Sequence, residues 1–337
     1  MKTRFLLALA LWASSAIGAM ADYAPPAMAK LPISNQLQPL SRVKDYRVVL
    51  QTCQGGSGKR LAVRAMNIDG DDLLLTVDPQ TLATQLERKD CWKCDDTTQP
   101  QQAGTRFIDA VNRFARQAGK VKPGWLENAG MTRGHEDRGV FVTGDLCPSR
   151  KPLDRGFLQK LEQPGAATPV ALSVSGLWIK QHPDDFAWLR KEKAEGRLAI
   201  TFVNHSFHHQ YRPGVADGQN FLLTPGVDMQ EEILDVEKLL IVNGETPSVF
   251  FRFPGLISNP ALMETLRENH LIPLGADAWL ALNPNQKVSS GAVVLVHPNG
   301  NEPFGLHLFE IHRDALPQPF RPINEAPWRA AVSIPDL

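Results

Sequence analysis

The sequence has no excess of charge of either sign, since 36 Lys and Arg residues balance 36 Asp and Glu residues over 337 positions. Proteins that bind nucleic acid usually carry a basic patch or stripe, so nucleic acid is not an expected partner. The G-x-S-x-G motif of many serine hydrolases is also missing, because "SVSGL" at 173–177 has no leading glycine. These two absences disfavour a nucleic-acid-binding protein and a serine hydrolase.

The N-terminus lacks an apolar run that reaches the roughly 20 residues needed to span a bilayer. Lys2 and Arg4 precede a short apolar run at 5–11, and an A-x-A sequence follows at 19–21. This order is typical of a cleaved secretory signal. We therefore expect a signal peptide at 1–21, no membrane span after its removal, and a periplasmic or secreted protein.

Cysteine is scarce, with Cys53, Cys91, Cys94 and Cys147 as the four in the chain. An even number in an exported protein first indicates disulfides, and four cysteines allow three pairings. The sequence "DCWKC" contains a C-x-x-C, but no second C-x-x-C or thioredoxin-like pattern accompanies it. We predict a disulfide between Cys53 and either Cys91 or Cys94, and an unpaired, buried thiol at Cys147.

The first part of the chain reads as an arm followed by a small β-rich module. Residues 22–44 are rich in Pro, Ala and Gln and predict a linker or extended arm. Residues 45–130 contain the β-like runs "YRVVLQTC", "RLAVRAMNI" and "DLLLTV", and then "GTRFIDAVNRFARQAG", which has a helical apolar face. We interpret this module as a structural brace, with binding of a glycan or a partner as the alternative.

From Gly139 onward the pattern changes to alternating strands and helices. The predicted strands are "VFVTGD", "PVALSVSG", "LAITFVNH", "SVFFRF", "LIPLGAD" and "AVVLVHP". Between most of them lie helical stretches, among them "DRGFLQKLE", "PDDFAWLRKEKAEG", "DMQEEILDVEKLLIVNG" and "NPALMETLRENH". Compact apolar runs of this kind are typical of strands buried on both faces. The alternation over 131–337 predicts a parallel sheet with right-handed crossovers, closed or nearly closed into a barrel.

Polar groups stand at the carboxyl ends of these predicted strands. They are Asp145, the turn Ser175-Gly176, the pair Asn204-His205, Arg252, Asp277 and His297. In parallel βα folds the catalytic groups collect on this face, because the loops after the strands converge there. The pattern predicts a catalytic site built from several strands.

The stretch "FVNHSFHHQY" at 202–211 holds three histidines within five residues. His205 and His209 are four residues apart, so a helical turn would place both imidazoles on one face, where they can share a metal ion. Neutral imidazole is a common ligand of zinc and similar ions. In this geometry His208 points elsewhere, and we interpret it as a partly exposed loop histidine.

Five segments together resemble the motifs of a known family. In this order, "VTGDLCPS", "NHSFHH", "FFRFPG", "GADAW" and "VLVHPNG" are similar to the five motifs of the NodB-like polysaccharide deacetylases, a carbohydrate esterase family. The similarity covers roughly residues 139–300. It implies an α/β fold, a distorted (β/α) barrel of the NodB-like type preceded here by the β-rich module. It also implies a metal-dependent hydrolase that removes acetyl groups from N-acetylated sugars.

The resemblance also implies roles for single residues. His205 and His209 match the two metal-binding histidines, and Ser206 matches the hydroxyl residue that braces their loop. The remaining matches are Arg252 beside Asp145, Gly255 as an oxyanion donor, Asp277 as the group that polarises His297, His297 as general acid, and Trp279 and Leu295 as walls for the acetyl methyl group.

One position departs from the family pattern. Family members usually have two adjacent aspartates in the first motif, a base and then a metal ligand, whereas here Leu146 follows Asp145. We therefore predict Asp145, His205 and His209 as ligands of a divalent ion, zinc, with cobalt or nickel as alternatives. The departure also keeps open a catalytically weakened carbohydrate-binding protein on the same fold. Neither the glycan nor the oligomeric state follows from the sequence.

Overall fold

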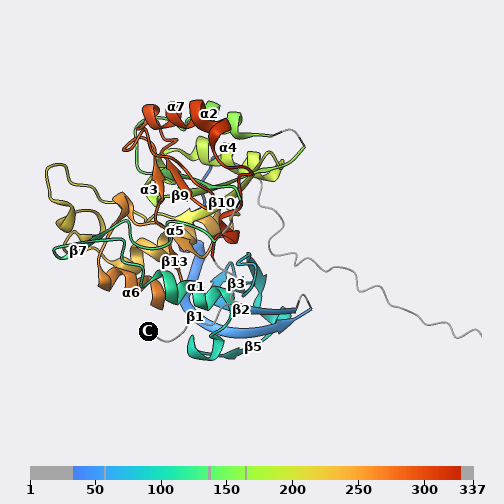
Figure 1. The fold of residues 1–337 in the computed structure, drawn as a ribbon. Helices are drawn as coiled ribbons and strands as arrows, with labels where there is room; N and C mark the ends of the chain where they lie inside the picture. The colour runs from blue at the N-terminus through green and yellow to red at the C-terminus, as the bar shows by residue number, and fades with distance from the viewer. Residues whose placement is uncertain (1–32, 57, 136–137, 164, 328–337) are drawn as a thin grey trace, which may run out of the picture.

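The computed structural model describes residues 33–56, 58–135, 138–163 and 165–327 (Figure 1). The predicted signal peptide at 1–21 and the start of the arm lie outside these ranges. The described end of the arm contains a short 3-10 turn, Leu40–Arg42, and the Gln38 backbone N–H donates to Asn243 Oδ1 at 3.0 Å. This end of the arm therefore lies against the α/β part of the chain.

The β-rich module is an antiparallel sheet in the order β4-β3-β2-β1-β5. Its strands are β1 Val43–Gly55, β2 Gly58–Ile68, β3 Asp71–Val77, β4 Thr84–Arg88 and β5 Trp92–Asp96. The first three confirm the predicted strands. The two edge strands were not predicted, because "TQLER" and "WKCDD" carry too few apolar residues to stand out, and edge strands without fully buried side chains do not need them.

The sheet register selects the disulfide. Cys53 on β1 lies directly opposite Cys94 on β5, and the two are bonded, with their Cα atoms 4.1 Å apart. Cys91 precedes β5 in a 3-10 turn, Lys89–Cys91, and its free thiol is exposed. The prediction of a disulfide from Cys53 is confirmed, and the register resolves the choice between its two candidate partners.

The second part is a sheet of seven strands in the order β13-β11-β10-β9-β8-β15-β14, and every neighbouring pair is parallel. The strands are β8 Phe141–Leu146, β9 Thr168–Val174, β10 Leu198–Asn204, β11 Phe250–Phe251, β13 Ile272–Pro273, β14 Ala278–Trp279 and β15 Val293–Val296. The curled sheet confirms the predicted distorted (β/α) barrel. Its two edge strands, β13 and β14, do not pair with each other within the described ranges, so of the two predicted forms, closed or nearly closed, the sheet is not the closed one.

Helices flank this sheet (Figure 1). They are α2 Arg155–Leu161, α3 Gly176–Gln181, α4 Pro183–Ala194, α5 Met229–Val242, α6 Pro260–Glu268 and α7 Pro303–His312. Of these, α2, α4, α5 and α6 match the predicted helical stretches. A small antiparallel sheet is made of β6 Lys120–Lys122, β7 Trp125–Glu127 and β12 Ile257–Ser258.

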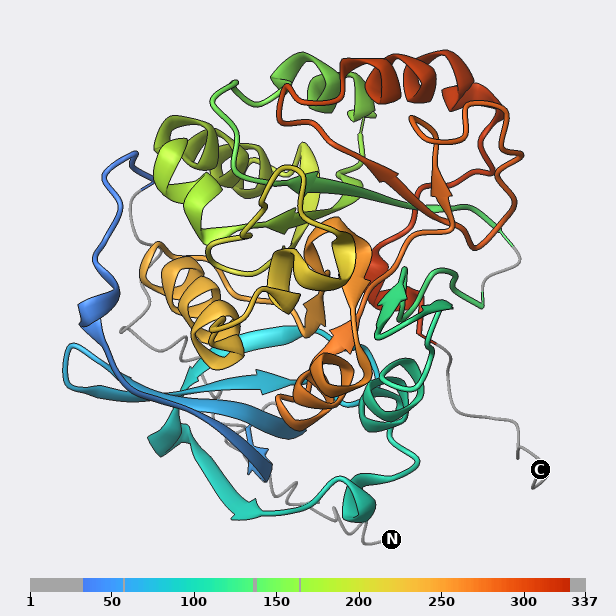
Figure 2. The same ribbon diagram turned by 90° about the vertical axis from the view of Figure 1, so that its left-hand side faces the viewer.

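The module and the parallel sheet share a hydrophobic core. One buried cluster joins Leu61 of β2 and Phe107 of α1, Arg106–Phe114, to Phe141 of β8 and Phe250 of β11. Figure 2 shows the module lying against the α/β part, with α1 beside it. Burial of these side chains on both sides supports the interpretation of the module as a brace.

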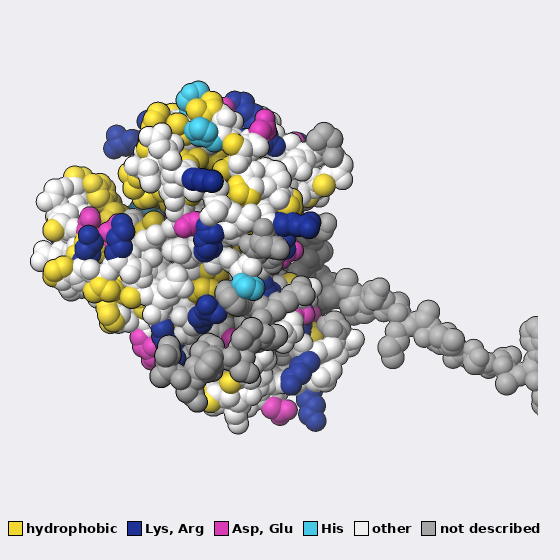
Figure 3. Space-filling model, in the orientation of Figure 1, with side chains coloured by type: hydrophobic (Ala, Val, Ile, Leu, Met, Phe, Trp, Pro, Cys, Tyr) yellow, Lys and Arg dark blue, Asp and Glu magenta, His cyan; other side chains and the backbone are white. Residues whose placement is uncertain are grey.

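The surface agrees with the balanced composition. On the face shown in Figure 3, Lys and Arg side chains are scattered, with Asp and Glu between some of them. Among the described residues, no helix combines the length and the apolar character that a transmembrane span requires.

Candidate metal and catalytic site

The histidine loop begins directly after β10. It does not form the helical turn on which the expected pairing of His205 and His209 was based. Ser206 and His209 both adopt left-handed backbone angles, with φ of 63° and 47°, and the segment between them has no helical turn. The His209 backbone N–H donates to Ser206 Oγ at 3.2 Å, which agrees with the bracing role implied for Ser206. This tight loop brings the rings of His205 and His209 to a centroid distance of 4.7 Å.

Each of these two imidazoles keeps a ring nitrogen available for a ligand. His205 is fully buried, and its Nδ1 lies 2.8 Å from the carbonyl oxygen of Arg252. Because a carbonyl only accepts, Nδ1 carries the proton and Nε2 keeps its lone pair. His209 is 8% exposed, and its buried Nε2 has no hydrogen-bond partner among the described residues. A buried, unpaired nitrogen carries a desolvation cost that a metal ion would remove.

His208 faces away from this site, as predicted. Its Nδ1 lies 2.8 Å from Glu232 Oε1, and its backbone N–H donates to Glu232 Oε2 at 2.9 Å. The side chain of His208 is 39% exposed. The structure thus divides the three histidines into a facing pair and a surface residue.

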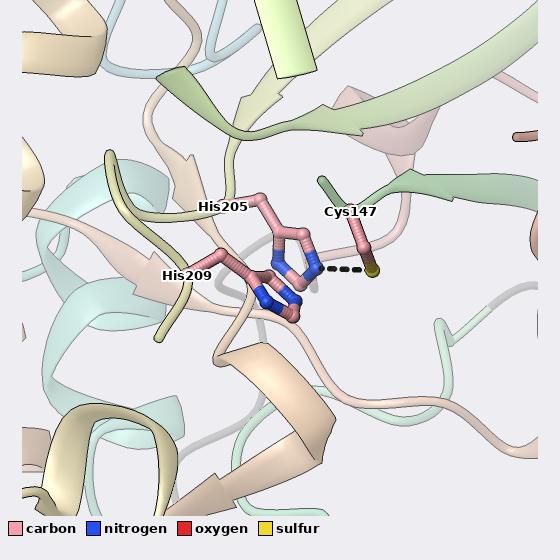
Figure 4. A group of neighbouring side chains, drawn as sticks. All are labelled: Cys147, His205 and His209. Carbon is pink, nitrogen blue, oxygen red and sulfur yellow. Dashed lines mark hydrogen bonds between the residues drawn. The ribbon is translucent and has the colours of Figure 1, made fainter. Parts of the chain in front are cut away.

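Cys147 lies beside the facing pair. Its Sγ is 3.5 Å from His205 Nε2, and one ligand atom from each of Cys147, His205 and His209 lies within 4.8 Å of the others (Figure 4). The thiol is free, as predicted, but half-buried rather than fully buried. The donors fit a zinc-type ion, whose protein sites use thiolate and imidazole. One feature of the sequence could have indicated this position. Cys147 stands two residues after Asp145, and residues two apart in a strand point to the same side.

Asp145, at the end of β8, is held by a fully buried arginine. Arg252 Nη1 donates to Asp145 Oδ1 at 2.8 Å, and the other guanidinium contacts are Thr143 Oγ1 and the carbonyls of Leu274 and Gly275. Burial disfavours the charged carboxylate, but Arg252, with His205 and His297, lowers the pKa of Asp145 to about 2. Oδ2 is left 3.7 Å from His205 Nε2. Asp145 is thus ionised, with one oxygen directed toward the histidines.

Leu146 takes no part in the site. Its side chain is fully buried in the apolar cluster that includes Val142, Leu172 and Val174. Successive side chains of a strand point to opposite faces, which places Leu146 on the core side of β8. An aspartate at this position would therefore meet the hydrophobic core rather than the two histidines.

His297, after β15, is oriented by Glu302, which was not predicted from the sequence. Its Nδ1 lies 3.0 Å from Glu302 Oε2, and Glu302 also accepts from Trp279 Nε1 at 2.9 Å. Burial favours neutral imidazole, but hydrogen bonds with Cys147 and Glu302 raise the pKa of His297 to about 10. The only sequence signal for Glu302 was a carboxylate five residues after His297.

Asp277, predicted to polarise His297, has a different partner. Its Oδ2 accepts from Arg133 Nη2 at 3.0 Å, and these two side chains are 30% and 41% exposed. The contact with His297 that was expected of Asp277 is made by Glu302, because the loop after β15 folds back toward His297 and Trp279.

The predicted acetyl pocket residues do come together. Leu295 is buried in a small cluster with Leu256 and Ala276, and Trp279 packs against it. The rings of Trp279 and His297 are 5.1 Å apart. Gly255 has a φ of 62°, and a Cβ on it would lie 2.5 Å from the ring of Phe221, so this turn requires glycine.

Comparison with known proteins gives likeness at the level of the fold. No model of a known protein family matches the chain. Among solved structures, a family 4 carbohydrate esterase from Bacillus anthracis is 18% identical with a TM-score of 0.41, and the match covers 66% of this chain and 92% of that chain. The Bacillus subtilis family 4 carbohydrate esterase PdaA is 13% identical with a TM-score of 0.43, over 69% and 90%.

The matches also include a family 4 pseudoenzyme from Bacillus anthracis, which is 14% identical with a TM-score of 0.41 and covers 66% of this chain and 82% of that chain. These carbohydrate esterases are the group to which the five sequence motifs point.

Proposed function

We propose that this protein is an exported, metal-dependent hydrolase that removes N-acetyl groups from an amino-sugar polysaccharide or a peptidoglycan-like glycan. The observation that carries the proposal is the convergence of four groups at one edge of the sheet. They are the carboxylate of Asp145 held by an arginine, the facing imidazoles of His205 and His209, and the imidazole of His297 held by a carboxylate.

A divalent ion, zinc with cobalt or nickel as alternatives, would be held through His205 and His209. The sequence predicts Asp145 as a further ligand, and Cys147 Sγ lies in the same group of donor atoms. When bound, the ion would polarise the acetyl carbonyl and make a water molecule acidic enough to attack near neutral pH. A de-N-acetylase needs both effects, because an amide is a poor electrophile.

The residues of the chain account for the proton transfers. Arg252 occupies Asp145 Oδ1, which leaves Oδ2 to accept the proton of the attacking water. Glu302 accepts from His297 Nδ1, which leaves Nε2 to donate a proton to the departing amine. Gly255 is proposed as the backbone donor to the oxyanion, and Trp279 with Leu295 as the apolar wall for the acetyl methyl group.

The cell compartment is part of the proposal. The Cys53–Cys94 disulfide supports folding in an oxidising compartment, such as the periplasm or the exterior. An N-acetylated glycan that lies outside the cytoplasm is then the substrate that fits both the site and the location.

A second candidate is a carbohydrate-binding protein that has lost catalysis. Leu146 favours it, because this buried side chain offers no oxygen where the related family usually has its second aspartate. An acetate-release assay separates the two functions. The purified protein is stripped with a chelator and then tested with and without zinc or cobalt on acetylated chitooligosaccharides, peptidoglycan fragments and exported amino-sugar polysaccharides.

We expect acetate release only with metal. The variants His205→Ala and His209→Ala should lose both bound metal and at least about 100-fold of the activity, since each removes a ligand. His208→Ala is the matched control and should keep both, because His208 pairs with Glu232 at the surface. Glycan binding without acetate release under every metal condition would contradict the hydrolase and favour the binding protein.

A further inference from the structure

We propose that Cys147 Sγ is the third protein ligand of the ion held by His205 and His209, so that Asp145 is free to act as the base. This inference rests on the proposed function only in taking the site to hold a divalent ion. It differs from the ligand set that the sequence predicts, in which Asp145 joins the two histidines.

Geometry favours the thiol over the carboxylate. Donor atoms of Cys147, His205 and His209 all lie within 4.8 Å of one another, and Asp145 is not a member of this group. Figure 4 shows both imidazoles directed toward Sγ, with the contact from His205 drawn. The buried Nε2 of His209 has no hydrogen-bond partner among the described residues, so it is available to bind a metal ion.

The backbone explains how a cysteine reaches this place. Leu146 enters the core, and the residues on either side of it, Asp145 and Cys147, both lie on the side of the site. The Cys147 carbonyl accepts from Asn299 Nδ2 at 3.2 Å, which ties the start of its loop to the loop after β15. A thiol one residue beyond the position of the expected second aspartate thus supplies the missing anionic donor.

The hydrogen bonding of Asp145 also favours Cys147 as the third ligand. Arg252 Nη1 donates to its Oδ1 at 2.8 Å, so a guanidinium already binds one of its two oxygens. A catalytic zinc commonly has three protein ligands and keeps its fourth position for water. Cys147, His205 and His209 complete such a set, and Oδ2 of Asp145 remains beside it to take a proton.

The identity of the donor has a consequence for metal choice. Thiolate is a soft ligand that favours zinc and cobalt, whereas a carboxylate in the same place would suit magnesium or manganese better. We therefore expect this protein to bind zinc and cobalt strongly and to discriminate against magnesium and manganese.

The test uses cobalt as a spectroscopic probe of the full-length mature protein. A cobalt–thiolate bond gives an intense near-ultraviolet charge-transfer band that nitrogen and oxygen ligands do not give. We expect this band in the wild type, its loss in Cys147→Ser, and a fall in zinc affinity of about 100-fold or more in that variant, since loss of an outer-shell partner alone typically costs 10–100-fold. Cys91→Ser, which alters the exposed free thiol, is the matched control and should keep the band.

Two further variants sharpen the test. Cys147→Asp should bind metal without the band, and Asp145→Asn should keep both the metal and the band while activity falls. Loss of metal in Asp145→Asn, with no band in the wild type, would overturn the inference and restore Asp145 as the ligand. Retention of the band and of zinc affinity in Cys147→Ser would also overturn it.

Failure of this inference is distinguishable from failure of the proposed function. Metal-dependent acetate release by a wild type that shows no cobalt–thiolate band would leave the hydrolase intact and reject only Cys147 as a ligand. A wild type that binds neither zinc nor cobalt would reject both.

Discussion

Two buried arginine–carboxylate pairs, one between the β-rich module and the barrel and one at the strand ends, are built in different ways. Arg64 of β2 binds both oxygens of Glu237 of α5, at 2.7 and 2.9 Å, and Tyr46 donates to the same carboxylate. Arg252 binds only one oxygen of Asp145. Both pairs are almost completely buried, with exposed side-chain fractions of 4% or less.

The difference is the one expected between a structural pair and the functional pair that we propose. At the module interface all three guanidinium nitrogens of Arg64 donate: Nε and Nη2 to Glu237, and Nη1 to the carbonyls of Val63 and Asn269. At the strand ends, by contrast, the buried Nε2 of His209 has no hydrogen-bond partner among the described residues, and Asp145 Oδ2 lies 3.7 Å from His205 Nε2. Leaving such groups buried costs stability, and an active site accepts that cost because its groups have to meet substrate or metal.

Asp145→Asn should break the functional pair with the largest effect on turnover. The amide keeps an acceptor for Arg252 but cannot take a proton from water, so we expect acetate release to fall by about 10²–10⁴-fold. Steady-state kinetics of acetate release checks this. The control is Asp277→Asn, which alters the half-exposed pair with Arg133 and should change turnover little. Equal losses of turnover in Asp145→Asn and Asp277→Asn would contradict the role of Asp145 as the base.

Glu237→Gln should break the structural pair and act on stability instead. It leaves the charge of Arg64 buried without a counter-ion, which typically costs about 3–5 kcal/mol of unfolding free energy. Denaturant unfolding measures the loss. Asp235→Asn on the same helix is the control, because the Asp235–Lys238 pair is partly exposed and contributes about 1 kcal/mol or less. Per folded molecule, zinc binding by Glu237→Gln should match the wild type.

The module interface should also be sensitive to acid. His270 accepts from Gln99 Nε2 at 2.9 Å, and burial, with Arg64 and Arg267 nearby, lowers its pKa to about 4. The unfolded chain binds this proton near pH 6.5 and the folded chain only near 4, so stability is complete above about 6.5 and falls as the pH drops toward 4. The expected loss from this residue is about 3 kcal/mol.

His270→Gln should flatten this dependence, as measured by urea unfolding at several pH values between 4 and 7. The same substitution at the exposed His312 of α7 is the control and should leave the profile unchanged. A wild-type profile that is already flat in this window would contradict the assignment to His270.

Glu302→Gln should have the smallest effect of the four. Glutamine still reaches His297 and Trp279, but it loses the negative charge that orients and stabilises the imidazolium. We expect turnover to fall by about 10–100-fold with zinc content unchanged, and the alkaline limb of the pH–rate profile to move to lower pH. Loss of zinc in this variant would instead place Glu302 in support of the ligands.

The sequence predicted the strand-end residues well where their position is a local property. Arg252, His205 and His297 each follow a compact apolar run, and parallel strands bring such positions to one edge whatever the loops do. The sequence was less informative where the conformation of a loop determines which side chains come into contact. The pairing of His297 with Glu302 rather than Asp277 depends on how the segment after β15 turns back, and no periodicity encodes that turn.

By itself, the amino-acid sequence determined the alternation of strands and helices, the β-rich module and the two histidines of the candidate site, because apolar periodicity and strand ends are short-range features. Only the tertiary structure decided that Cys94 pairs with Cys53, that Leu146 faces the core and that Cys147 stands beside His205 and His209. These outcomes depend on sheet register, on which face of β8 meets the core, and on loops with left-handed residues. Each joins groups that are far apart in the chain, and their contact exists only after the sheets have assembled.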